Sequence, residues 1–172
     1  NLYGSLILPE NLEYIGLGAF QNCRGFTGSL EIPKRVSVIH QEAFNYCGFD
    51  GILKLHDGII NIEENAFRCR FKGELVLPKN LFVLSNGVFA GCNFSGELKL
   101  PEKLSSIGDF AFGDNQRLTG VLEIPQSVQN IGEGAFIGCS MIEKLILSDN
   151  LESIGSVAFG NCFYINSIVC KS

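Results

Sequence analysis

Several features that would point to a particular chemistry are missing from this chain of 172 residues. It has no tryptophan, a single methionine, and no C-x-x-C pair of the kind that binds zinc or carries out redox chemistry. It also has no run of about twenty apolar residues, the length needed to span a bilayer. Its 13 lysines and arginines are outnumbered by 18 aspartates and glutamates and form no basic stripe. We therefore expect no nucleic-acid partner and no membrane insertion by this segment.

The N-terminal stretch NLYGSLILPE lacks an initiator methionine and the basic, apolar, small-residue order of a signal peptide. We expect the chain to be a processed form or a segment of a longer protein. Its 46% hydrophobic and 18% charged residues favour a folded chain, and its length suits one domain over residues 1–172.

What the chain does contain is a repeat. The motif G-x-L-x-(I/L)-P recurs at a step of roughly two dozen residues, in the range of leucine-rich repeats. Counted from the leucine of this motif, here called the anchor, apolar residues recur at +2, +6 and +9, a small residue at +13 and phenylalanine at +14. One apolar residue type per position predicts stacked coils with a continuous core. Ile168 would open an eighth coil, after seven with anchors at Leu6, Leu30, Leu53, Leu75, Leu98, Leu122 and Leu145.

Each coil carries signals for short strands. Proline at +3 donates no ladder hydrogen bond, so it ends a strand of about three to five residues, such as SLEI or GELKL. A glycine two residues before the anchor indicates a turn with positive φ or a close backbone approach. The next segment predicts a second short strand and a single helical turn. The expected fold class is a β-rich solenoid of leucine-rich-repeat coils with short parallel strands, turns and single helical turns.

The repeat L-x-(I/L)-P-x-x-(L/V)-x-x-I-G-x-x-A-F-x-x-C, as in LEIPQSVQNIGEGAFIGC, resembles the BspA-like leucine-rich repeat. The resemblance extends over almost the entire chain, and the G-x-L variant is most similar to Bacteroides-type members. It implies a cell-surface or secreted bacterial protein that adheres to host matrix proteins or to other bacteria. The family has no defined catalytic residues to transfer, and this chain departs from the pattern only in single coils, at Val88, Leu84, Asn115, His56 and Ser148.

Six of the seven cysteines follow the phenylalanine by two or three residues and form a row of the repeat. Stacked coils would place them about 4.8 Å apart in a line, whereas zinc needs four converging sulfurs. Disulfides between coils would strain the stack. We expect free buried thiols and no metal or cofactor. Asn115 replaces one cysteine with a residue able to bond the loop backbone, and Cys170 falls at a core position.

No catalytic constellation is evident. His40 and His56 lie in different coils at different offsets, so neither forms a nucleophile–base pair with a cysteine. His56 stands at a proline position, where we expect it to cap a strand end. Glu63 and Glu64 are typical of a solvated surface rather than of an acid–base pair. We expect no enzyme activity.

The positions on either side of the anchor vary where the core does not. In a strand these residues point away from the core. They mix charge with aliphatic side chains, which suits protein contact as well as an ordinary solvated face. The candidate partner-binding residues are Glu31, Ile52, Lys54, Glu74, Val76, Glu97, Lys99, Val121 and Glu123. A weaker candidate for an anionic glycan or an acidic protein is the positive cluster Arg68, Arg70 and Lys72.

The leading functional hypothesis is a non-enzymatic protein-interaction module that adheres to host or bacterial proteins through its strand face. A structural spacer within a larger surface protein is the second hypothesis. A third, carbohydrate recognition, expects exposed aromatic platforms, whereas most aromatic residues here occupy core offsets.

Overall fold

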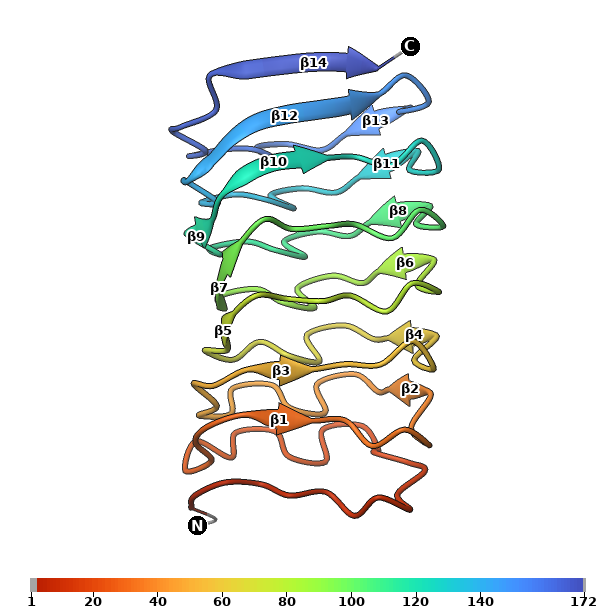
Figure 1. Cartoon of the computed structure of the whole chain (residues 1–172), viewed down its shortest axis with the longest axis vertical. Helices are drawn as coiled ribbons and strands as arrows, with labels where there is room; N and C mark the ends of the chain where they lie inside the picture. The colour runs from red at the N-terminus through yellow and green to blue at the C-terminus, as the bar shows by residue number, and fades with distance from the viewer. Residues whose placement is uncertain (1–2, 172) are drawn as a thin grey trace.

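The computed structural model describes residues 3–171, which form a parallel-strand solenoid of about six turns (Figure 1). The predicted stack is confirmed: equivalent residues of successive coils lie beside one another, and the chain climbs along a single axis. Among these residues there is no helix, and so none that could cross a membrane.

The anchor strands pair in the predicted register. Leu30 lies opposite Leu53, and Leu145 lies between Leu122 and Ile168. Ile168 therefore lies in register beside the seventh anchor. These strands are β1 (Leu30–Glu31), β3 (Leu53–Lys54), β10 (Gly120–Glu123), β12 (Ile142–Ser148) and β14 (Ser167–Lys171).

A second series of two-residue strands follows the proline turn, as predicted. These strands form sheets of two and four strands on another side of the coil. They are β2 (Val38–Ile39), β4 (Asn61–Ile62), β6 (Val83–Leu84), β8 (Ser106–Ile107), β11 (Asn130–Ile131) and β13 (Ser153–Ile154).

In the middle coils the expected anchor strand is displaced. The stretch GELKL, residues 96–100, was predicted as a strand. The paired strand is instead β7 (Asn93–Gly96), which ends two residues before the anchor Leu98. It pairs with β5 (Lys72–Gly73) and β9 (Arg117–Leu118). Gly73 and Gly96 have φ of 80° and 84°, and they are followed by the buried anchors Leu75 and Leu98.

The predicted helical turn is wrong, and the backbone hydrogen bonds give the reason. A helix needs consecutive N–H groups to bond within their own segment. Here alternate N–H groups bond within the coil, and those between them donate to the next coil. In the fifth coil the outward donors and their acceptor carbonyls are Phe110 with Glu133, Phe112 with Ala135 and Asp114 with Ile137, at 2.7–2.8 Å.

This alternation requires two left-handed residues in most coils. The residue at +12 from the anchor has positive φ in every coil, and it is glycine or asparagine in four of them: Gly18, Asn65, Gly87 and Gly134. Phe110 and Val157 adopt the same conformation, with φ of 53° and 49°. For a β-branched residue such as Val157 this conformation is strained.

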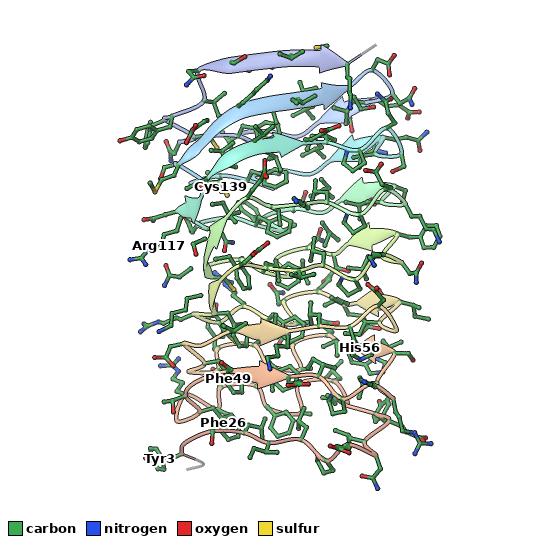
Figure 2. The ribbon with its side chains drawn as sticks, viewed as in Figure 1. Tyr3, Phe26, Phe49, His56, Arg117 and Cys139 are labelled. Carbon is green, nitrogen blue, oxygen red and sulfur yellow. The ribbon has the colours of Figure 1, made fainter. Side chains whose placement is uncertain are left out.

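The core is built from rows of stacked phenylalanine rings. The +14 row runs from Phe20 to Phe159 with nearly parallel rings whose centroids are 5.3–5.9 Å apart. A second row, Phe26, Phe49, Phe71 and Phe94, packs edge-on against the first. Figure 2 shows Phe49 following Phe26 along the stack.

Cys170 departs from expectation. It pairs in register with Leu147 at a core offset, but it is exposed because β14 is the edge strand of its sheet.

The phenylalanine row predicts a large loss of stability on truncation. Phe112 is fully buried between Phe89 and Phe136, so Phe112→Ala leaves a cavity and removes two stacked contacts. We expect a loss of about 3–5 kcal/mol in the free energy of unfolding, measured by urea titration. Phe82→Ala is the matched control: this side chain is 59% exposed, so its loss is expected to be below about 1 kcal/mol. Equal losses for the two variants would contradict the stacked core.

Relief of left-handed strain predicts a stabilised variant. Val157 is 57% exposed, so Val157→Asn removes little apolar burial while placing a residue that tolerates positive φ. We expect a gain of about 1 kcal/mol and a higher Tm. Val83→Asn, at an exposed strand position, is expected to lower Tm instead. A lower Tm for Val157→Asn would count against the strain.

Candidate functional site

The strand face is the surface formed by the residues flanking the anchors. The structure exposes eight of the nine candidate residues and leaves Val121 half-buried. Each of them is adjacent in sequence to an anchor leucine buried in the core, so the packing of the anchor fixes the position of its backbone. Two hollows open on this face.

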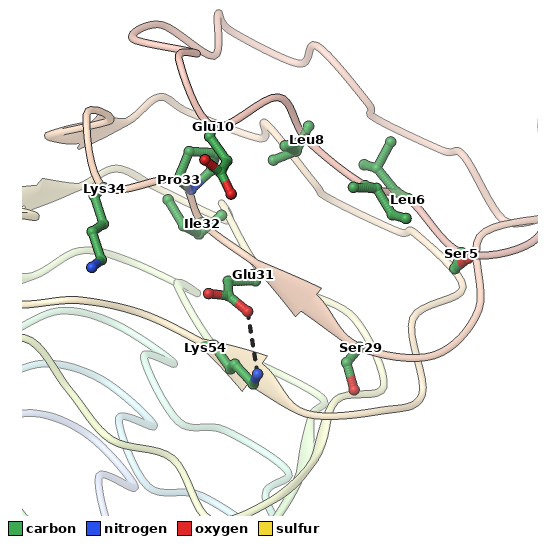
Figure 3. Close-up of a pocket in the computed structure, with 11 residues that line it drawn as sticks. Ser5, Leu6, Leu8, Glu10, Ser29, Glu31, Ile32, Pro33, Lys34 and Lys54 are labelled. Carbon is green, nitrogen blue, oxygen red and sulfur yellow. Dashed lines mark hydrogen bonds and ion pairs between the residues drawn. The ribbon is translucent and has the colours of Figure 1, made fainter.

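The first hollow has a volume of about 690 Å³ and lies over the first three coils (Figure 3). Ser5, Ser29 and Ile32 line it with Glu31 and Lys54. Lys54 Nζ donates to Glu31 Oε2 at 3.2 Å across adjacent coils. Both side chains are largely exposed, so this pair contributes little to stability and can be exchanged for contacts with a partner.

The second hollow, of about 600 Å³, brings together Glu74, Val76, Glu97 and Lys99 from the fourth and fifth coils. Lys79 and Lys103 extend its rim. Within residues 3–171, none of Glu74, Glu97 and Lys99 forms an ion pair. Uncompensated charge of both signs therefore surrounds the exposed aliphatic side chain of Val76.

The remaining strand-face residues lie outside these hollows. Ile52 is 47% exposed between the two, and Glu123 forms an ion pair with Lys171 at 2.5 Å. The strand face is thus a row of positions along the stack rather than one cavity.

The weaker positive candidate is divided by the structure. Arg68 and Arg70 line a third hollow of about 570 Å³, here called the arginine hollow, whereas Lys72 does not line it. Arg24 joins them there, although it is 44 residues away from Arg68 in sequence. The reasoning from sequence missed Arg24. The available signal was that Arg24 and Arg70 each directly follow a cysteine of the row.

The cysteine row forms a hydrogen-bonded ladder. The thiol of each cysteine from Cys47 onward in the row donates to the phenylalanine carbonyl of the preceding coil, as Cys92 does to Phe67 at 3.2 Å. Asn115 takes the same place and donates through Nδ2 to Phe89 O at 2.8 Å, so its expected bond to the loop backbone is confirmed.

Burial makes Cys92, Cys139 and Cys162 poor nucleophiles by raising the pKa of each thiol. It raises the pKa of Cys92 to about 12 and that of Cys162 to about 11, and it raises the pKa of Cys139 further. A thiol that stays protonated near neutral pH neither attacks a carbonyl nor binds a soft metal. Within residues 3–171 no group of three or more metal-ligating side chains converges.

The histidines and the paired glutamates have structural contacts. His56 Nε2 lies 3.0 Å from Pro33 O, and Gly58 N donates to His56 Nδ1. His56 thus joins two coils at a strand end, as its position predicts. His40 lies 3.3 Å from Glu63 Oε1 and against the ring of Tyr14. Glu63 also accepts from the Gln41 backbone.

The model of the BspA-type leucine-rich repeat region matches six copies, over residues 3–119 and 69–172. The chain belongs to the BspA-type leucine-rich repeat family. Comparison with curated protein sequences returns no significant match.

A leucine-rich repeat protein of Bacteroides ovatus has a similar solved structure, with a TM-score of 0.78 and 26% identity over 96% of this chain. A leucine-rich cell-surface protein of Faecalibacterium prausnitzii is more distant, with a TM-score of 0.44 and 17% identity over 90% of the chain. The chain spans 45% and 62% of the lengths of these two proteins. The family and its repeat solenoid are typical of protein-interaction modules without catalytic activity.

The cysteine ladder predicts a specific loss of stability at alkaline pH. The unfolded Cys92 thiol ionises above its ordinary pKa of 9.0, whereas the folded thiol stays protonated to about 12. Its contribution to stability is therefore complete below pH 9 and falls as the pH rises through this interval. Between about pH 8 and about pH 10.5 it falls by about 2 kcal/mol.

Urea titrations of Cys92→Ser at both pH values test this, because serine does not titrate there. The change in unfolding free energy between the two is expected to be about 2 kcal/mol smaller than in the parent protein. Cys170→Ser, at an exposed thiol, is the control and should leave that change unaltered. If Cys92→Ser also leaves it unaltered, the buried thiol is not responsible.

Proposed function

We propose that the chain is a non-enzymatic adhesion module of a cell-surface or secreted protein, and that it binds a protein partner through the strand face. The observation that carries this proposal is the second hollow, where Glu74, Glu97 and Lys99 are exposed around Val76 and form no ion pair with any residue of the described range 3–171. An apolar centre with unpaired charges around it is the composition of a protein-binding surface.

The constancy of the scaffold supports the same proposal. Anchors, phenylalanines and cysteines are repeated in almost every coil, whereas the strand-face positions differ from coil to coil. A rigid array of this kind holds its surface residues in place before binding, which lowers the entropic cost of association. The expected partners are host matrix proteins or proteins of neighbouring bacteria.

The membership in the BspA-type family supports a role at the cell surface. The Bacteroides ovatus neighbour is more than twice as long as this chain. In a larger protein the solenoid could serve instead as a spacer, and the experiment below separates the two roles.

Charge reversal on the strand face is expected to abolish partner binding. A triple variant, Glu74→Lys, Glu97→Lys and Lys99→Glu, reverses the unpaired charges while leaving the buried anchors intact. Binding to a panel of purified extracellular matrix proteins, measured by biolayer interferometry with the immobilised domain, should fall at least about tenfold for every protein that binds the parent.

The matched control carries the same net charge change on exposed residues away from the strand face: Glu133→Lys, Glu152→Lys and Arg117→Glu. It should bind as the parent does, and higher salt should slow association of the parent. If both triple variants lose binding equally, the loss is caused by the change in overall charge and not by the strand face. Unchanged binding by the strand-face variant would favour the spacer role.

A further inference from the structure

The arginine hollow lies on the turns after the phenylalanine row, away from the strand face. Its walls come from four successive coils, with Arg24 in the first and both Arg68 and Arg70 in the third. It shares no lining residue with the two strand-face hollows, so its function is independent of the proposed adhesion.

The hollow exists because glycine interrupts rows of larger residues. Gly48 lies between Arg24 and Arg70, each directly after a cysteine of the row. A Cβ atom at Gly48 would lie 2.2 Å from the Arg24 carbonyl oxygen, so the close approach of the two backbones keeps a side chain from standing between the two arginines. Gly91, which lines the hollow from the fourth coil, has φ of 69° and open space where its Cβ atom would be.

The charge of the hollow is not neutralised. No carboxylate lines it, and within residues 3–171 none of its three arginines forms an ion pair. The guanidinium of Arg68 lies 5.2 Å from the centroid of the Tyr46 ring, a cation–π contact that restrains it. A restrained guanidinium fork without a carboxylate partner favours an anionic ligand.

The backbone around the hollow limits the kind of ligand. The N–H groups of Gly48, Arg70 and Gly91 already donate to carbonyls of other coils. These three N–H groups are therefore not available to pair with the main chain of an acidic peptide. Arg24 and Arg70 stand two coils apart, roughly 10 Å at the spacing of β-strands, which is farther than one oxyanion reaches.

We propose that the arginine hollow binds an anionic polysaccharide, whose successive sulfate or carboxylate groups pair with Arg24, Arg68 and Arg70. A linear polysaccharide presents charges at intervals along a chain without needing main-chain hydrogen bonds. The volume of about 570 Å³ accommodates sugar rings beside the guanidinium groups.

Fluorescence anisotropy at about 0.15 M salt tests this with labelled dextran sulfate, polygalacturonate and neutral dextran. The protein should bind at least one of the two anionic polymers and not neutral dextran. Preference between them identifies sulfate or carboxylate as the group recognised. Arg24→Gln and Arg70→Gln should each weaken binding about tenfold, the effect of losing one charge-assisted pair.

Two further kinds of variant separate a built site from general attraction. Lys72→Gln and Arg117→Gln remove the same charge outside the hollow and should change affinity by less than about twofold. Gly91→Asn keeps the charge and tolerates the positive φ, but it occupies open space, so it should weaken binding without altering the urea midpoint.

The proposal is overturned if neither anionic polymer binds, or if the controls weaken binding as much as the hollow variants do. It is also overturned if Gly91→Asn binds as the parent does, or if polyglutamate competes as well as the polysaccharides, since recognition would then extend to an acidic peptide.

Discussion

Successive coils are joined by backbone hydrogen bonds at nearly every second residue, in the turns as well as in the strands. This ladder fixes the distance between equivalent residues at about the spacing of β-strands. A side chain at a core position therefore has its equivalent in the next coil as its neighbour, and the two must fit at that distance. Parallel phenylalanine rings meet the condition, and a row of them joins each coil to the next through stacked contacts.

The same constraint explains the row of cysteines without assigning it a catalytic or metal-binding role. Most phenylalanine carbonyls of the row accept a backbone N–H from their own coil, as Phe67 O does from Cys69 N, and each carbonyl oxygen can accept a second hydrogen bond. A thiol one coil further along is small enough to fit beside the rings and donates to that carbonyl. Asn115 fits by the same rule, because its amide donates to the same acceptor. The row thus suits a hydrogen-bond donor of limited size, and the raised pKa of the Cys92 thiol is a consequence of burial.

The strictness of the repeat made the architecture predictable from sequence. The offsets contain no insertions, and each position keeps one residue type. Two coils can therefore be aligned in few ways, and this predicts the register of Leu30 with Leu53 and of Leu145 with Ile168. The helical turn was mispredicted because a local pattern such as GDFAF carries no sign that alternate N–H groups donate to another coil. The displaced strand at Gly96 has a similar cause, because backbone pairing depends on neighbouring coils that the pattern does not describe.

The sites were less predictable than the fold, for a reason that the arginine hollow makes concrete. Sequence proximity grouped Arg68 and Arg70 with Lys72, whereas the stack brings Arg24 to them across two coils and leaves Lys72 outside. In a solenoid the neighbours of a surface residue lie about two dozen residues away along the chain.

A surface site in such a fold is consequently a pattern down a row of equivalent positions. Where glycine stands between long side chains, as Gly48 does between Arg24 and Arg70, no side chain separates the flanking ones, and these supply the chemistry. Where a row mixes unpaired charge with aliphatic residues, as on the strand face, it supplies a contact surface instead. The coil's constant residues hold these rows at a fixed spacing, so specificity can change by single substitutions that leave the stack unaltered.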